Sequence, residues 1–257
     1  MLKSYSDVES LQGGFTLIEL AIVLVIVGIL VGSFVGTLTS RIEITKKSDT
    51  IDELNEIKQA MMAYAFVNGY LPCPDCDVVA GNCVAGVQAD GVADYNGGAC
   101  LENQEAGNVP WVTLGLGRSD AWGTRYRYAV QNVYADENIA FGLNSAAGSA
   151  IIQEPDFSVV TVPPGATPKP LANNVVAIIF SHGKNGYGGI SEENVARAAI
   201  PVANLDELNN TDDDQFYYTR PETPAGANIA GREFDDIVTW ISEYELKAKM
   251  VEAGRLP

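Results

Sequence analysis

The stretch that decides the fold is residues 13–38, GGFTLIELAIVLVIVGILVGSFVGTL, in which Glu19 is the one ionisable side chain. As a helix that rises ~1.5 Å per residue, residues 15–38 would be about 36 Å long, enough to cross the hydrocarbon core of a bilayer. A carboxylate at mid-helix in a membrane costs roughly 2.5–3.5 kcal/mol, so it normally has a partner. The stretch therefore predicts a membrane anchor that carries one carboxylate in need of a counter-charge.

Small residues stand before this apolar run rather than after it. An ordinary secretory signal has its small-residue cleavage site after the apolar core, whereas here Gly13 and Gly14 precede it. Together with Glu19, this arrangement resembles the prepilin signal of type IV pilins and type II secretion pseudopilins. The resemblance implies cleavage between Gly14 and Phe15 by a prepilin peptidase/methyltransferase, followed by N-methylation of Phe15.

Glu19 lies one helical turn from the ammonium group that this cleavage would create at Phe15. In a filament, the Glu19 carboxylate of one subunit would meet the Phe15 ammonium of its neighbour, and two charges that are costly alone would become a pair. We therefore expect Glu19 to select the axial register of assembly. The alternative is a tolerated acid near the end of a plain membrane anchor.

Gly28, Gly32 and Gly36 follow one another at intervals of four within the apolar run. This spacing puts small residues on one flank of a helix, where a second helix can approach closely. We expect this flank to pack against other helices in a membrane or a filament core, although glycine is also common in membrane helices in general.

The helix is expected to continue beyond the apolar run, because apolar side chains recur there at spacings of three and four. Asn68-Gly69 followed by Pro72 would end it. The expected segments are a leader at 1–14, a transmembrane or filament-core helix at 15–39, an amphipathic continuation at 40–69 and a periplasmic headpiece at 70–257. One face of the amphipathic continuation should be covered by the strands that follow it. This stripe is predicted at Ile44, Ser48, Ile51, Leu54, Lys58, Met61, Met62 and Ala65.

Downstream of the helix, short apolar runs separated by glycine, proline and asparagine predict a β-rich body. The expected fold class is α+β and pilin-like: a long N-terminal helix packed on an antiparallel sheet with disulfide-bearing loops. Residues 120–128, DAWGTRYRY, resemble the major pseudopilins of type II secretion, in which this pattern is a structural turn that leads into a strand. Tyr126 and Tyr128 would share one face of that strand and pack in the core rather than bind a cofactor. Strands are expected at Arg125–Val130, Ile139–Leu143, Ser158–Val162, Val175–Ser181 and Asp236–Ile241, and a helix from a capping box at Ser242 to Ala253.

The four cysteines, Cys73, Cys76, Cys83 and Cys100, predict disulfides if the body lies outside the cytoplasm. Of the three pairings that four cysteines allow, we favour Cys73–Cys100 with Cys76–Cys83, because each pair closes a loop without a tight ring. The competing scheme is Cys73–Cys76 with Cys83–Cys100. A four-thiolate zinc site and a redox-active Cys-x-x-Cys are the other interpretations.

Residues 90–96, DGVADYN, resemble the end of an aspartate-rich calcium loop. Asp90, Asp94 and Asn96 would supply the oxygen ligands that calcium prefers, and Asp75 and Asp77 lie nearby in the same cysteine-bounded region. The full loop pattern is absent, because Gln88 and Ala89 stand before Asp90, and ordinary turns account for the same residues. No cofactor other than this calcium ion is expected.

The charge balance and the scarcity of catalytic motifs exclude several function classes. With a formal net charge of −17, the chain would repel phosphate, so nucleic acid is not expected as a partner. His182 is the one histidine, and neither a nucleophile motif nor a phosphate-binding loop accompanies it. We assign no catalytic residue and do not expect an enzyme.

The resemblance implies a structural subunit, a minor pilin or pseudopilin of a type IV pilus or type II secretion pseudopilus. Its expected partners are the prepilin peptidase/methyltransferase, other pilins or pseudopilins and an inner-membrane assembly platform. Cleavage requires Gly14 on the cytoplasmic side, so we expect a single pass of the inner membrane with a periplasmic body, followed by entry into a filament. Arg41, Lys46 and Lys47 by themselves would favour the reverse orientation. The alternatives are a membrane-tethered or filament-tip adhesin that binds through the Cys73–Cys100 loop and, more remotely, a tethered hydrolase.

Overall fold

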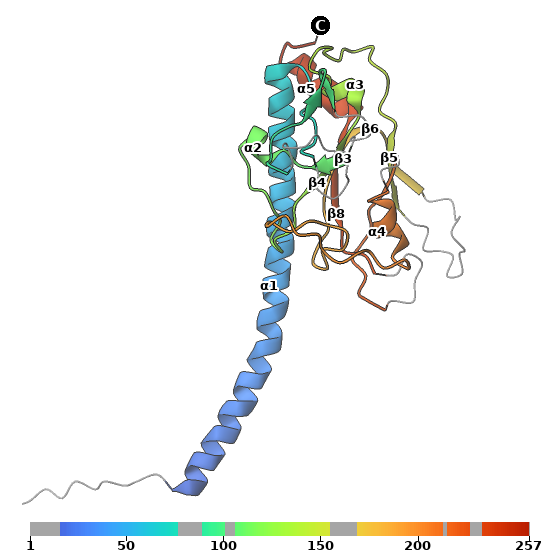
Figure 1. The fold of residues 1–257 in the computed structure, drawn as a ribbon. Coiled ribbons are helices and arrows are strands. Elements are labelled where there is room, and N and C mark those ends of the chain that lie inside the picture. The colour runs from blue at the N-terminus through green and yellow to red at the C-terminus, as the bar shows by residue number, and fades with distance from the viewer. Residues whose placement is uncertain are drawn as a thin grey trace, which may run out of the picture. The chain divides into compact units, whose positions relative to one another are not determined.

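The computed structural model describes residues 16–76, 89–100, 106–154, 169–212, 215–226 and 233–256, without the side chains of residues 33–39 and 154. The chain divides into two compact units, residues 1–45 and 46–257, which are described separately (Figure 1). The first unit holds the first part of helix α1. The second unit holds the rest of α1 and the body.

Helix α1 runs from Leu17 to Asn68, close to the predicted extent. Gly69 ends it with φ +90°, a conformation that glycine adopts without steric cost, and its N–H bonds to the Ala65 carbonyl at 2.8 Å. The end predicted at Asn68-Gly69 is therefore confirmed.

The face of α1 that the body covers begins at Thr50 rather than at Ile44. Ile44 is 69% exposed, Ile51 is 40% exposed and Ser48 is exposed as well, so their places in the predicted stripe are wrong. Each residue turns a helix by about 100°, which carries Ile51 out of the face that Thr50 occupies. The buried stripe consists of Thr50, Leu54, Ile57, Met61, Met62 and Ala65.

The body is built on a six-stranded sheet in the order β3-β4-β6-β5-β7, with β8 also paired to β6. All pairings are antiparallel except that of β5 with β7, which is parallel. A separate two-stranded hairpin joins β1 (Tyr95–Asn96) to β2 (Ala99–Cys100). The six strands are β3 (Ala106–Asn108), β4 (Arg127–Val130), β5 (Ala150–Glu154), β6 (Lys169–Ser181), β7 (Phe216–Tyr218) and β8 (Ile237–Ser242).

Strand β6 is central, since it pairs with β4, β5 and β8, and its second half, Val175–Ser181, is buried on both faces. One face joins a cluster that includes Ile179, Tyr128 and the stripe of α1, so the sheet lies against the second half of the helix (Figure 1). The other face joins a smaller cluster around Ile178 and Phe180. Burial on both sides explains the continuous apolar run in the sequence and confirms the central strand predicted there.

Two of the other predicted strands are present in the structure, and one is absent. The strands predicted at Arg125–Val130 and Asp236–Ile241 are confirmed in β4 and β8. Residues 139–143 form no strand: Ile139 is 68% exposed, and the Gly142 N–H bonds to the Ser145 hydroxyl in a turn, so this prediction is wrong. The strand predicted at 158–162 lies outside the described residues.

Within the described residues, four further helices complete the body. Helix α5 (Glu243–Glu252) begins as predicted, because the Ser242 hydroxyl caps it by accepting the Glu245 N–H at 3.2 Å. The other three were not predicted: α2 (Trp111–Leu114), α3 (Asn132–Ala135) and α4 (Leu205–Asn209). Each has only four or five residues, too few for a helical period to appear in the sequence.

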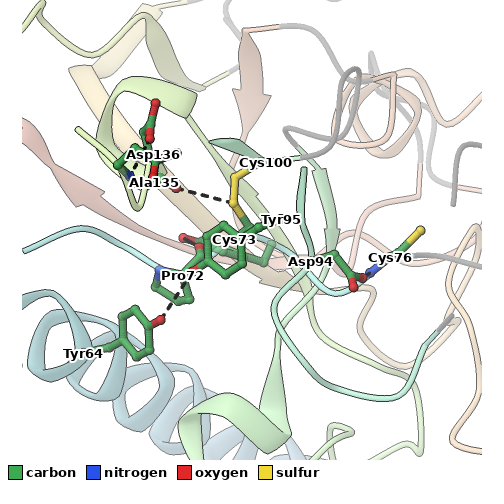
Figure 2. Close-up of a disulfide and its surroundings, with 11 residues drawn as sticks. Tyr64, Pro72, Cys73, Cys76, Asp94, Tyr95, Cys100, Ala135 and Asp136 are labelled. Atoms are coloured by element: carbon green, nitrogen blue, oxygen red, sulfur yellow. Dashed lines mark hydrogen bonds between the residues drawn. A yellow bond between two sulfur atoms is a disulfide. The ribbon is translucent and has the colours of Figure 1, made fainter. Parts of the chain in front are cut away.

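A disulfide between Cys73 and Cys100 ties the segment after α1 to the β1–β2 hairpin (Figure 2). The favoured pairing is thus confirmed for this pair, and the competing Cys73–Cys76 scheme and the four-thiolate zinc site are wrong. Cys76 is not a free thiol. Its predicted partner, Cys83, lies outside the described residues.

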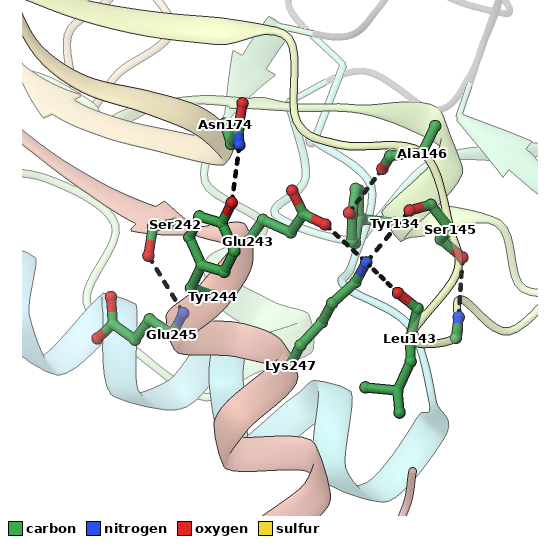
Figure 3. A network of polar contacts seen from close by, with 11 residues as sticks. Tyr134, Leu143, Ser145, Ala146, Asn174, Ser242, Glu243, Tyr244, Glu245 and Lys247 are labelled. Carbon is green, nitrogen blue, oxygen red and sulfur yellow. Dashed lines mark hydrogen bonds and ion pairs between the residues drawn. The ribbon is translucent and has the colours of Figure 1, made fainter. Parts of the chain in front are cut away.

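Helix α5 is fastened to the segment before β5 by a buried lysine (Figure 3). The Lys247 ammonium donates to the carbonyls of Leu143 (2.9 Å) and Ser145 (3.2 Å) and forms an ion pair with Glu243 at 2.7 Å. Lys247 and Glu243 are both 8% exposed. Three acceptors satisfy the three donors of the ammonium, which allows the charge to stay buried.

His182 is a second buried ionisable group. It directly follows β6, is 1% exposed, and packs edge-on against Phe180 with ring centroids 5.1 Å apart. Burial, together with the charge of Arg127, lowers the pKa of His182 to about 3. The folded protein therefore holds the imidazole neutral at a pH where an unfolded chain would protonate it.

We predict that Lys247→Met lowers the free energy of unfolding by about 3–5 kcal/mol, because the Glu243 carboxylate stays buried without its cation. Urea denaturation of the full chain in detergent measures this loss. Lys249→Met removes the exposed pair with Glu252, two residues farther along α5, and is the matched control without measurable loss. An equal effect of the two substitutions would contradict the assigned role of Lys247.

We predict that the free energy of unfolding falls as the pH falls below 6.5, because the unfolded chain then binds a proton that folded His182 does not. With a folded pKa of about 3, the contribution between pH 6 and pH 4.5 is about 2 kcal/mol. Denaturation of the wild type and His182→Asn across this pH range isolates this contribution. Parallel curves for the two proteins would show that His182 plays no part in the acid sensitivity.

Candidate functional site

The start of α1 carries a reciprocal cap between Thr16 and Glu19. One Glu19 carboxylate oxygen accepts the Thr16 N–H at 3.2 Å and the Thr16 hydroxyl at 3.0 Å. The Glu19 N–H in turn donates to the Thr16 hydroxyl oxygen at 3.2 Å. This is a capping box, and the negative charge lies at the positive end of the helix dipole.

The surface behind this cap is apolar and exposed. Exposure within this set ranges from 47% at Val27 to 91% at Leu17, far above the level of a core side chain. An apolar surface this long marks a site of contact with other molecules. Its members are Leu17, Ile18, Leu20, Ile22, Val23, Leu24, Val25, Ile26, Val27, Ile29, Leu30 and Val31.

The glycines of this segment leave open space beside the helix. A Cβ atom added to Gly28 or Gly32 would meet no other atom within 4 Å. Gly36 also lies in α1, within the part whose side chains are not described. The space at Gly28 and Gly32 is compatible with the predicted packing flank.

The membrane span predicted at 15–39 finds no support in the structure. Among the described residues, no helix contains a stretch that is both long and apolar enough to be a candidate span. The transmembrane helix therefore stays a prediction.

The processing residues Gly14 and Phe15 lie outside the described residues. The first residue after them, Thr16, was missed as a functional candidate although Thr16-x-x-Glu19 matches the sequence signature of a capping box. The geometry shows that Glu19 already has a hydrogen-bonding role within its own chain before any partner arrives.

The residues predicted to bind calcium do not converge on one point. Asp90 is exposed and its carboxylate caps the Val92 N–H at 2.9 Å. Asp94 is buried and accepts the Cys76 N–H at 2.7 Å (Figure 2). Asn96 is exposed on β1. A calcium site with this ligand set stays a prediction.

A different carboxylate cluster, unremarked as a set in the sequence, lies between α4 and the segment before β8. Glu207, Asp235 and Asp236 bring carboxylate oxygens within 4.8 Å of one another, an arrangement that could hold a hard cation. Burial and the nearby Glu207 raise the pKa of Asp235 to about 7. Asparagine amides hold the cluster together: Asn185 and Asn204 donate to Glu207, and Asn210 donates to Asp236.

Comparison with known proteins gives one result for the N-terminal segment. Residues 10–35 match the family described as "Prokaryotic N-terminal methylation motif". Neither curated proteins nor solved structures gave a match to the chain. The matched range contains Gly14, Phe15, Glu19 and the capped start of α1. The chain therefore carries the N-terminal methylation signal of type IV pilins and pseudopilins.

Proposed function

We propose that the chain is a minor pilin or pseudopilin, a structural subunit of a type IV pilus or type II secretion pseudopilus. The observation that carries this proposal is the methylation motif at 10–35, followed directly by an exposed apolar helix. The body supports it, since a sheet packed on the second half of a long N-terminal helix is the architecture that the resemblance implies. In this function the helix packs against the helices of other subunits and the body exposes its loops on the filament surface, so no catalytic group is required.

Glu19 is the residue that we propose to control assembly. Cleavage after Gly14 leaves an ammonium group on Phe15, next to the Thr16 N–H that the Glu19 carboxylate accepts. When apolar helices pack around this end, an unpaired carboxylate would be costly, whereas a neighbouring subunit's ammonium group offsets much of that cost. Only axial registers that bring the two charges together then avoid the penalty.

The proposed function also implies where the subunit lies in the cell and which proteins process and assemble it. The prepilin peptidase/methyltransferase acts on Gly14 and Phe15 at the cytoplasmic side of the inner membrane, and the body faces the periplasm. An inner-membrane assembly platform then passes the processed subunit to other pilins or pseudopilins. A filament-tip adhesin that binds through the Cys73–Cys100 loop stays an alternative prediction, because residues 77–88 of that loop lie outside the described residues.

We predict that Glu19→Ala lowers incorporation into filaments at least tenfold while cleavage after Gly14 continues. The physical reason is that the register-setting charge pair is lost while the apolar helix surface remains. Immunoblotting of sheared filaments against the membrane fraction measures incorporation, and the mass of the membrane-bound protein reports cleavage. Asp52→Ala, an exposed acid farther along α1, is the matched control with wild-type incorporation.

Wild-type incorporation of Glu19→Ala would refute the role assigned to Glu19. An absence of cleavage and of incorporation for the wild-type chain itself would refute the filament function.

A further inference from the structure

Asp75 and Asn108 form a buried polar pair outside the sites described above, and among the described residues the one donor that acts on the Asp75 carboxylate is the Gly91 backbone N–H, outside ordinary hydrogen-bond geometry. Asp75 is fully buried and Asn108 is 1% exposed. Neither carboxylate oxygen of Asp75 and neither carboxamide atom of Asn108 makes a hydrogen bond of ordinary geometry. Leaving one buried polar group unsatisfied costs about 1–3 kcal/mol, and such groups are rare in native proteins.

The backbone places the Asp75 and Asn108 side chains next to each other on one face of an antiparallel bridge. Asp75 and Asn108 face each other across an antiparallel bridge, with both N–H···O=C hydrogen bonds at 2.9 Å. Directly opposed residues in such a pair extend from the same face with their Cβ atoms about 5.5 Å apart. Gly107 permits this close approach, because a Cβ there would lie 2.6 Å from the Asp75 carbonyl oxygen.

The charges around the pair leave a deficit of positive charge. Asp94 lies next to Asp75, since its carboxylate accepts the Cys76 N–H. Burial, together with the charges of Asp94 and Asp90, raises the pKa of Asp75 to about 7, while the Gly91 N–H and Arg125 act in the opposite direction. Arg125 is itself buried over the Trp111 ring and donates to the Ala89 carbonyl at 3.2 Å. Arg125 is the one cation among these groups, so a bound divalent cation would favour the ionised forms of the buried Asp75 and Asp94 carboxyl groups.

We propose that Asp75 and Asn108 are the inner ligands of a calcium site, with Asp94 as the adjacent carboxylate. The donors are carboxylate and carboxamide oxygens, without imidazole or thiolate, which favours a hard cation. Calcium accepts the irregular, flexible oxygen sets that magnesium rejects. The site differs from the ligand set predicted at Asp90, Asp94 and Asn96, because Asn96 is exposed and the two inner ligands come from other segments.

Occupancy would also stabilise the fold around the disulfide. Asp75 lies two residues after Cys73, and Asn108 ends β3, which pairs with β4. A cation shared by the two segments would hold the start of the disulfide-closed loop against the edge of the sheet. Stabilisation by a ligand that binds only the folded state grows with the logarithm of its concentration.

The test uses the full chain in detergent, stripped with EDTA and titrated with calcium chloride by calorimetry, together with thermal melts. We expect heat of binding and a rise in the melting temperature of roughly 5 °C at a hundredfold excess over Kd. Asp75→Asn should weaken calcium binding at least tenfold. Asp52→Asn, which removes an exposed charge from α1, is the matched control and should leave calcium binding unchanged. Asp235→Asn reports any binding at the Glu207–Asp235–Asp236 cluster instead.

The Asn108→Asp variant tests the site independently if Asp75→Asn fails to fold. It keeps the side-chain shape and adds a ligand charge, so it should bind calcium more tightly and melt at a lower temperature in EDTA. Absence of heat and of a melting shift in the wild type would overturn the proposal. Loss of binding in Asp235→Asn but not in Asp75→Asn, or an equal response to magnesium chloride, would overturn it as well.

Discussion

Helix α1 carries apolar side chains on both halves, and among the residues that the structure describes only side chains of the second half are buried. Over its second half, side chains such as Leu54 and Met61 are buried beneath the sheet of the body. Over its first half, the side chains from Leu17 to Val31 are exposed. A Leu, Ile or Val side chain gains about 1.5–3 kcal/mol when it is buried. The first half of α1 therefore favours association with lipid or with similar helices, and Glu19 is the one charge that such association must accommodate.

The body provides a rigid support for the second half of α1. The second half of its central strand β6 is buried on both faces, and the Cys73–Cys100 disulfide and the Lys247 network fasten neighbouring segments to one another. Polar groups are buried where they have partners, as with Lys247 and Glu243. Asp75 and Asn108 depart from that rule, and this departure is what a bound cation would explain.

Local patterns in the sequence predicted much of this structure. The end of α1 at Asn68, the cap of α5 at Ser242 and the central strand each depend on neighbouring residues, so they could be recognised. The strand predicted at 139–143 is wrong because its apolar residues belong to a turn stabilised by Ser145. The Asp75–Asn108 bridge joins segments distant in the sequence and could not be read from spacing. Thr16 could have been identified, since its capping box is a local signature.

Assembly of this subunit depends most on Phe15 becoming the charged first residue of a helix that packs among the helices of other subunits. Intact-mass and N-terminal peptide mass spectrometry of the protein from cells with an active prepilin peptidase tests this directly. We expect a chain that lacks residues 1–14 and begins with N-methylated Phe15. A mature protein that still carries Met1 to Gly14 would contradict the account.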